Sequence, residues 1–421
     1  MNEQELIPHL FRTEFSKISS VLSKLFGIEH IEIAEDIASE TFLSALETWP
    51  YKGIPPNPVA WLYTVAKNKT RNYLHRNFIY AENVIPEIDS DAITHFEVDL
   101  SEKNISDSQL QMLFTLCHPS IPVEAQIGLS LRILCGFGID EIATAFLTNK
   151  ESINKRLFRA KEKLREEKIK IEFPGLNEID HRLDTVLTTL YLLFSEGYYS
   201  ENKEEVIREE LCQEAMRLTY MLLENKLTNQ PKVNALYALM CFHASRLPAR
   251  KKDNGEIILY GDQDESLWDK EMITKGAYYL HDASAGNRIS KFHLEASIAY
   301  WHTIKEDTKE KWENILQLYN RLLQLEYSPI AALNRTFALS KVNGKEEATL
   351  EAEKLNLDGN HFYHVLLGEL YSGIDDNKAK DFFRKAVTLA KTNSEKQVIL
   401  KKMDLLLFPL PPKGGIESKR N

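Results

Sequence analysis

Amide, guanidinium and imidazole side chains gather on one segment that follows a proline-rich loop. The loop, residues 51–58, holds three prolines and a glycine, so it cannot continue a helix, whereas Asn57 followed by Pro58 is a typical helix start. Along that helix the polar groups that can bind nucleic acid are Asn68, Arg71, Asn72, His75 and Arg76. Amide and guanidinium groups hydrogen-bond base edges and phosphates, and aromatic rings stack on unpaired bases. The segment predicts a surface that binds a separated DNA strand. Trp61 either stacks on a base of that strand or packs in the protein core.

A second segment has the pattern of a helix-turn-helix. Residues 139–146 form its first helix, residues 147–149 the turn, and Ile153 and Leu157 point the second helix inward. The side chains then free to enter a major groove are Glu151, Ser152, Asn154, Lys155, Phe158 and Arg159. Basic side chains that would instead meet DNA phosphates are Arg156, Lys161, Lys163 and Arg165. The alternative is an ordinary helical hairpin.

The distribution of charge favours the DNA-binding interpretation, although the net charge is -10. Residues 57–80 carry four Lys or Arg and no acid, and residues 150–170 carry nine Lys or Arg against four Glu. Residues 81–107 between them hold eight acids and one Lys. DNA responds to the charge of the contacting face within about 8 to 10 Å at physiological salt. Two basic segments therefore outweigh the overall acidity, whereas either one alone could be a solvated helix face.

The elements that position these segments are all predicted to be helices, so the fold class is all-α. Apolar residues recur at helical spacing over 5–26 and 31–49 before the basic helix, and over 108–118 and 122–135 before the helix-turn-helix. The acidic stretch between is weakly periodic and predicts a flexible linker.

Beyond residue 180 the pattern is helix after helix to about residue 408, interrupted by a hairpin-like turn around 252–256. The spacing of Leu367, Gly368 and Tyr371, followed by Ala379, Phe383 and Ala386, is close to that of one tetratricopeptide repeat. A helical solenoid or an irregular helical bundle fits this half of the chain.

Several classes of function find little support. The chain has no apolar run long enough for a transmembrane helix and no secretory signal, and its four cysteines form no CxxC pair, which favours reduced cysteines in the cytoplasm. Asp262, Asp264, Glu265 and Asp269 could bind a metal or transfer protons, but charged loops are more often solvated. His361 and His364 are spaced like metal ligands on a helix, but no third Cys, His or carboxylate follows at a spacing typical of a metal site. We expect no enzyme, no metal and no cofactor.

Two motifs together resemble a known family. Residues 34–46 (AEDIASETFLSAL) and 61–68 (WLYTVAKN) resemble region 2 of extracytoplasmic-function sigma factors, group 4 of the sigma-70 family, and residues 138–165 resemble their region 4. Residues 113–119, 193–198 and 262–269 match a subgroup that carries a long helical, tetratricopeptide-like C-terminal extension.

The resemblance implies a role for each candidate residue. Residues that would dock on the clamp helices of the largest subunit of RNA polymerase core are Asp36, Glu40, Phe42 and Leu43. Residues that would hold the melted minus-ten element are Trp61, Asn68, Arg71, Asn72, His75 and Arg76. The helix that begins near Lys150 would read the minus-thirty-five element through Glu151, Ser152, Asn154, Lys155, Phe158 and Arg159. The polymerase flap is a further implied contact, and the acidic linker would lie in the channel that later carries RNA.

These inferences predict five segments: region 2 (1–80), an acidic linker (81–107), region 4 (108–172), a helical extension (173–411) and a tail (412–421). The expected function is promoter-specific transcription initiation in the cytoplasm, with RNA polymerase core and promoter DNA as partners and no membrane. The extension would regulate activity in cis or bind a further protein partner. The alternative is a helix-turn-helix regulator fused to a helical-repeat scaffold and independent of polymerase.

Overall fold

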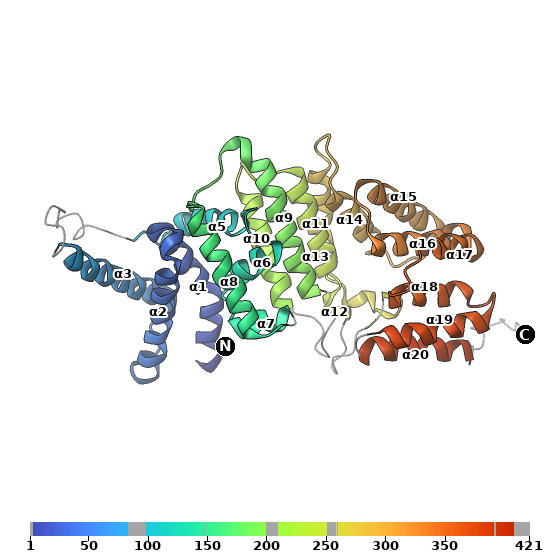
Figure 1. The fold of residues 1–421 in the computed structure, drawn as a ribbon, viewed down its shortest axis with the longest axis horizontal. Coiled ribbons are helices and arrows are strands. Elements are labelled where there is room, and N and C mark those ends of the chain that lie inside the picture. The colour runs from blue at the N-terminus through green and yellow to red at the C-terminus, as the bar shows by residue number, and fades with distance from the viewer. Residues whose placement is uncertain are drawn as a thin grey trace, which may run out of the picture. The chain divides into compact units, whose positions relative to one another are not determined.

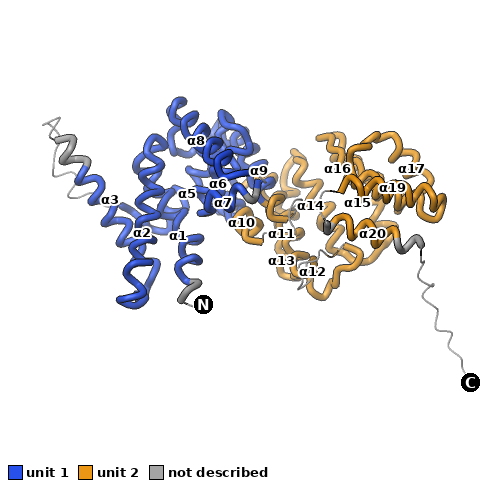
Figure 2. Tube along the Cα trace, turned by 60° about the horizontal axis from the view of Figure 1, so that its bottom comes forward, with its two compact units in different colours: residues 1–193, 217–228 blue, residues 194–216, 229–421 orange. Residues whose placement is uncertain are grey.

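The computed structural model describes residues 3–82, 98–146, 148–198, 209–250, 258, 260–390 and 393–407. Throughout these ranges the regular elements are helices, without any strand, and this confirms the all-α prediction (Figure 1). The expected hairpin-like turn at 252–256 and most of the acidic linker lie outside the described residues. The chain divides into two compact units (Figure 2): Met1–Leu193 with Arg217–Thr228, and Phe194–Met216 with Asn229–Asn421.

The first unit contains the two segments that the sequence singled out. Its helices are α1 (Glu3–Phe26), α2 (Ile31–Lys52), α3 (Pro58–Glu82), α5 (Glu102–Leu116), α6 (Val123–Ile133), α7 (Ile139–Ala145), α8 (Lys150–Glu166), most of α9 (Leu176–Tyr198) and the later half of α10 (Glu209–Glu224). Apolar side chains of α1, α2 and α3 form one core, in which the rings of Phe11, Phe15 and Phe42 lie against one another.

The end of the predicted linker belongs to this core. Val98 and Leu100 are buried in it, and Ser101 caps α5, which begins at Glu102 rather than near residue 108. The buried Gln109 side chain donates a hydrogen bond to the Ser16 hydroxyl of α1 at 3.1 Å. The prediction of a flexible linker is therefore wrong for residues 98–107, because apolar side chains within the acidic sequence pack on α1.

The first helix of the extension packs on the helices that precede the helix-turn-helix. Thr189 of α9 donates a hydrogen bond to the Gln126 side chain of α6 at 3.0 Å, and Arg182 donates one to the backbone carbonyl of Phe114 at 2.5 Å. Arg217 of α10 donates to the backbone carbonyl of Leu134 at 3.1 Å. The boundary expected near residue 172 thus falls inside the first unit.

The second unit is built of consecutive packed helices. They are α11 (Pro231–Ala244), α12 (Leu247–Arg250), α13 (Lys270–Ala283), α14 (Lys291–Trp301), α15 (Lys309–Leu325), α16 (Pro329–Asn343), α17 (Lys345–Glu353), α18 (His361–Tyr371), α19 (Asp376–Leu389) and α20 (Asn393–Leu407). From α14 onward each helix contacts the next one along the chain. A Cβ on Gly368 of α18 would lie 2.8 Å from the Phe383 ring of α19, so this close approach requires glycine.

Candidate nucleic-acid interface

Helix α3 is positioned by its N-terminus and by one buried side. The Asn57 side chain accepts a hydrogen bond from the backbone N–H of Ala60 at 3.0 Å, which confirms the predicted cap. Leu62, Ala66 and Thr70 are buried against α1 and α2. Trp61 is half-buried and lies edge-on to the Trp49 ring of α2, 5.4 Å between centroids. Trp61 therefore anchors the helix while part of its surface stays exposed.

The opposite side of α3 presents the polar groups that the sequence singled out. The side chains at 68, 71, 72, 75 and 76 are all exposed. At about 100° per residue these five positions fall on one face about 140° wide. Arg71 donates a hydrogen bond to the Asn68 side chain at 3.1 Å, which holds its guanidinium along the helix. This face offers amide, guanidinium and imidazole groups to a nucleic-acid strand without first disturbing the core.

Helix α2 carries an exposed stripe of carboxylates and leucines. Asp36, Glu40 and Leu43 lie on this stripe as predicted, and Leu46, which the sequence did not single out, is also about half exposed. Burial first, and then the neighbouring charges of Glu35, Glu40 and Glu32, raise the pKa of the Asp36 carboxyl. Glu40 forms an ion pair with Lys69 of α3 at 3.1 Å. Exposed leucines beside acidic groups suit a basic partner surface with an apolar centre.

Phe42 does not belong to this stripe. Its side chain is only 3% exposed and packs against Phe11 and Phe15. The expectation that it contacts a partner is therefore wrong for the side chain, which holds α2 on α1. The spacing of Ala38, Phe42, Ala45 and Trp49, all buried, was the signal in the sequence, because positions three or four residues apart share a helix face.

Helices α7 and α8 form at the residues predicted for a helix-turn-helix. The Asn149 side chain accepts a hydrogen bond from the backbone N–H of Ser152 at 2.8 Å and so caps α8. Ala143 of α7 is buried, as are Ile153 and Leu157 of α8. Gly128 of α6 leaves room for the Leu157 side chain, since a Cβ there would lie 2.9 Å from its Cδ2. The N-terminal end of α8 is thereby held with its outer face free.

The outer face of α8 contains the residues expected to read bases. Glu151, Asn154, Lys155, Phe158 and Arg159 are exposed, and Ser152 is partly exposed. Within the described ranges, the side chains of these six residues form no hydrogen bond or ion pair; the only such bond at these positions is the one from the Ser152 backbone N–H to the Asn149 side chain. An exposed phenylalanine beside Lys and Arg can contact a thymine methyl while the cations reach guanine or phosphate.

The cations expected to meet phosphates are engaged within the chain. Lys161 lies 2.5 Å from a carboxylate oxygen of Glu35 in α2, and Arg165 pairs with Glu32 of the same helix. Arg156 lies over the Phe146 ring, 5.5 Å from its centroid, and Lys163 pairs with Glu167 at 3.0 Å. The link between α8 and α2 was absent from the sequence analysis, because its partners lie more than 120 residues apart in the chain.

Three of the groups considered for metal or acid–base chemistry, Asp264, Asp269 and His364, have structural roles. Asp264 and Asp269 accept hydrogen bonds from the backbone N–H groups of Ser266 and Met272 as helix caps. His364 is buried and lies 2.8 Å from the backbone carbonyl of Asp358. Over the described residues, no group of three or more His, Cys, Asp or Glu side chains is arranged to hold a metal ion.

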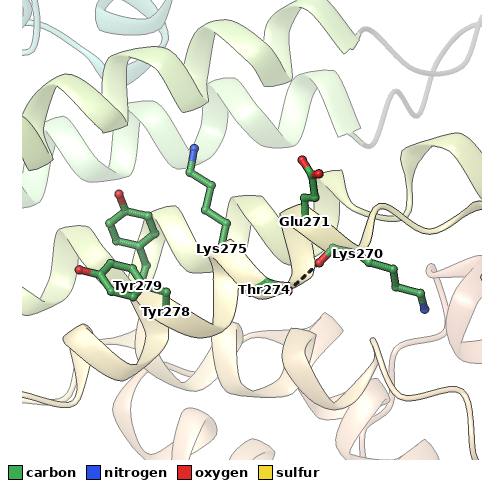
Figure 3. A pocket seen from close by; sticks show the side chains of 6 residues that line it. All are labelled: Lys270, Glu271, Thr274, Lys275, Tyr278 and Tyr279. Carbon is green, nitrogen blue, oxygen red and sulfur yellow. Dashed lines mark hydrogen bonds between the residues drawn. The ribbon is translucent and has the colours of Figure 1, made fainter.

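A shallow groove of about 510 Å³ lies along α13 in the second unit (Figure 3). Its lining residues are Lys270, Glu271, Thr274, Lys275, Tyr278 and Tyr279. Thr274 donates a hydrogen bond to the backbone carbonyl of Lys270 at 2.9 Å. The groove offers tyrosine and lysine side chains but no arrangement of a nucleophile and a base.

Comparison with known proteins agrees with the character of the first domain. Residues 10–77 match sigma-70 region 2, and residues 182–284 match a family of unknown function (DUF6596). An uncharacterized protein of Rhizobium meliloti (strain 1021) is 34% identical over 399 residues, which cover 93% of this chain and 94% of the relative. No solved structure matches the chain significantly. Within the described ranges, no helix is both long enough and apolar enough to cross a bilayer.

The sigma-70 region 2 domain at residues 10–77 supports a sigma factor of the sigma-70 family acting in transcription initiation. The chain belongs to the same family as the rhizobial protein, since the two are similar over nearly their whole lengths.

Proposed function

We propose that the chain is an RNA polymerase sigma factor of the extracytoplasmic-function group, with a C-terminal helical extension that regulates it in cis. The observation that carries the proposal is the exposed polar face of α3 within a domain that matches sigma-70 region 2. A second exposed face, on α8 of a helix-turn-helix, follows in the same chain.

The α3 face is suited to the melted minus-ten element. Removing a base from the stack costs a few kcal/mol, which pocket contacts must offset. Asn68 and Asn72 supply amide donors and acceptors, and Arg71 and Arg76 supply charge for the phosphates beside them. The exposed part of Trp61 lies at the N-terminal end of this face and can support a base.

The α8 face is suited to the minus-thirty-five duplex. Its N-terminal residues are the ones that a recognition helix presents to base edges in the major groove. Lys155 and Arg159 form hydrogen bonds with guanine in such a groove, and Phe158 supplies apolar contact. We assign α5 to α8 to region 4, although α5 also packs on α1.

The α2 stripe is suited to polymerase core. Asp36 and Glu40 would meet basic side chains on the clamp helices of the largest subunit, and Leu43 and Leu46 would fill apolar space between them. The polymerase flap would contact region 4. Because core polymerase and promoters are in the cytoplasm, the chain would act there and needs no membrane.

The extension is suited to a regulatory role because its first helix is part of the unit that holds both DNA-binding faces. From α14 to α20 each helix packs on the next, with a glycine–phenylalanine contact at the position where tetratricopeptide repeats place small and large residues. Such a stack suits a tetratricopeptide-like surface for a protein partner.

Co-purification tests the proposal. Tagged full-length chain should retain RNA polymerase core, and Asp36→Arg should weaken retention at least about tenfold, because a like-charge contact costs more than about 1.4 kcal/mol. Glu306→Arg is the matched control: Glu306 is exposed in the second unit, and the change in net charge is the same. If the chain binds duplex DNA tightly alone and ignores polymerase, the independent regulator is the correct alternative.

A further inference from the structure

A buried arginine of the second unit has no carboxylate partner. Arg246, which follows α11, is only 8% exposed, and among the described residues no Asp or Glu forms an ion pair with it. Its Nη2 lies at the long distance of 3.4 Å from both the Tyr198 hydroxyl and Nδ1 of His243. Its Nε–H has no acceptor. Because a buried charge without compensation is strongly destabilising, this guanidinium is suited to bind an anion.

A second buried cation without a carboxylate partner lies at the start of α15. Lys311 is 1% exposed, and its Nζ donates hydrogen bonds to the Tyr260 hydroxyl at 3.1 Å and to the backbone carbonyl of Ile304 at 2.6 Å. Burial lowers the pKa of the Lys311 ammonium, an effect that the charge of Asp307 only partly offsets. Asp307 itself forms an ion pair with Lys341 at 3.1 Å, whereas within the described ranges Lys311 forms none. Two of the three N–H groups of Lys311 are therefore used, and the third can meet a ligand.

The ring of Tyr260 lies between these two cations and a third one. The centroid of this ring is 5.5 Å from the guanidinium carbon of Arg246, 5.4 Å from Nζ of Lys311 and 5.5 Å from Nζ of Lys305. Nζ of Lys305 donates hydrogen bonds to three backbone carbonyls of residues 260–263. The charge of Arg246 lowers the pKa of Lys311, so the two cations repel each other. An aromatic face attracts cations but has no net charge, so an anion would still relieve this repulsion.

Neutral polar groups beside the same ring also lack partners. Trp268 is 3% exposed, its ring centroid lies 6.1 Å from that of Tyr260, and its Nε1–H has no acceptor. Nδ1 of His302, whose ring lies 5.3 Å from that of Tyr260, has no partner either. Gln263 is 6% exposed and adds an unpartnered acceptor, Oε1. Buried polar groups are normally hydrogen-bonded, so a ligand that offers several acceptors and one donor fits this set.

Partly exposed residues connect this cluster with solvent. Tyr260, His302 and Lys305 are each partly exposed, so a small ligand can reach the cluster from their side. The segments 193–198 and 262–269, which take no part in the DNA-binding faces, both contribute to the cluster. The cluster is therefore separate from the surfaces assigned to DNA and polymerase.

From this arrangement we propose that the cluster binds phosphate, either free or as the phosphate group of a small metabolite. Arg246 and Lys311 donate charge-assisted hydrogen bonds to the phosphate oxygens, and Trp268 donates a neutral one. Hydrogen phosphate keeps one O–H at neutral pH, which Oε1 of Gln263 can accept, whereas a carboxylate has no such group. The site would give the extension a small-molecule effector. That regulatory role rests on the proposed function, but phosphate binding does not.

Tryptophan fluorescence of the full chain tests the proposal without polymerase or DNA. Inorganic phosphate is titrated against chloride at constant ionic strength, because the basic DNA-binding faces respond to screening. We expect a saturable change in fluorescence, which Trp268→Phe should reduce. Lys311→Met should raise the dissociation constant at least about tenfold, because a hydrogen bond to a charged group is lost. Lys309→Met is the matched control, since it removes the same charge from the same helix and its side chain is 72% exposed.

Thermal unfolding gives the second readout, since a ligand that binds only the folded state raises the Tm as its concentration rises. Phosphate should raise the Tm of the wild type and of Lys309→Met, but not that of Lys311→Met. If Lys311→Met loses helical circular dichroism, Arg246→Gln must remove the phosphate effect instead. A larger effect of glycerol 3-phosphate than of inorganic phosphate would support the site and identify a phosphorylated metabolite as its ligand. Equal effects of phosphate and acetate, or equal effects of phosphate on Lys311→Met and Lys309→Met, would overturn the inference, whatever the polymerase pull-down shows.

Discussion

The hydrogen bond between Thr189 of α9 and Gln126 of α6 gives the sharpest test of where the DNA-binding unit ends. Both side chains are buried, and the Thr189 hydroxyl, which has a single hydrogen, lies 3.0 Å from the Gln126 side-chain oxygen and 3.0 Å from the backbone carbonyl of Thr185. The Gln126 amide nitrogen donates to the backbone carbonyls of His118 and Ile121. Thr189→Val keeps the shape of the side chain but leaves the Gln126 oxygen without its donor. A buried acceptor left unsatisfied costs about 1 to 3 kcal/mol.

Thermal unfolding followed by circular dichroism measures this loss. For a unit of about 200 residues, 1 to 3 kcal/mol corresponds to a Tm lower by about 2 to 12 °C. Thr188→Val is the matched control, because the Thr188 hydroxyl donates only to the Asp184 carbonyl of its own helix. That control should change stability by less than about 0.5 kcal/mol. Equal effects of the two substitutions would refute the packing of α9 on α6 within the first unit.

The same contacts bear on how the extension is studied. A chain that ends after Lys170 lacks α9, and with it the Arg182 and Thr189 hydrogen bonds to α5 and α6. Loss of activity in such a chain would mix a folding defect with loss of regulation. Point substitutions on the second unit separate the two.

Two further predictions concern the second unit. Gly368→Ala should destabilise it by about 1 to 3 kcal/mol in urea unfolding, because the new Cβ would overlap the Phe383 ring. Gly359→Ala is the control and should not destabilise the unit, because a Cβ there meets nothing within 4 Å. If Gly368→Ala left the free energy of unfolding unchanged, the packing of α18 on α19 would be contradicted. Burial first, and then the charges of Arg246 and Lys311, lower the pKa of His302 to about 3. The unfolded state, with a His pKa near 6.5, therefore binds more protons than the folded state at acid pH. The free energy of unfolding should fall as the pH drops below 6.5, by about 1.6 kcal/mol between pH 6.5 and 5. If His302→Asn showed the same acid dependence as the wild type, His302 would be excluded as the cause.

Local signals in the sequence predicted local structure. Asn57 caps α3 as predicted, because a cap needs only its own side chain and the next three residues. Asn149, predicted only as part of the turn, caps α8 in the same way. Ile153 and Leu157 are buried because helical spacing alone defines the inner side of α8.

Contacts between distant segments could not be predicted in this way. Val98 and Leu100 looked like minor apolar positions in an acidic linker, and only the surface of α1 explains their burial. The pairing of Glu35 with Lys161 joins residues 126 positions apart, with no periodic pattern to connect them. Phe42 is different: its spacing with Ala45 and Trp49 indicated the core, whereas the family resemblance assigned it to the partner surface.

Transcription by a reconstituted holoenzyme tests the central claim most directly. Core polymerase and the full chain are incubated with a library of randomised promoters, and the transcripts are sequenced. The account predicts transcripts that depend on the chain and share two sequence blocks, with Arg71→Ala weakening selection of the downstream block and Arg159→Ala that of the upstream block. Absence of chain-dependent transcripts from every template would contradict it.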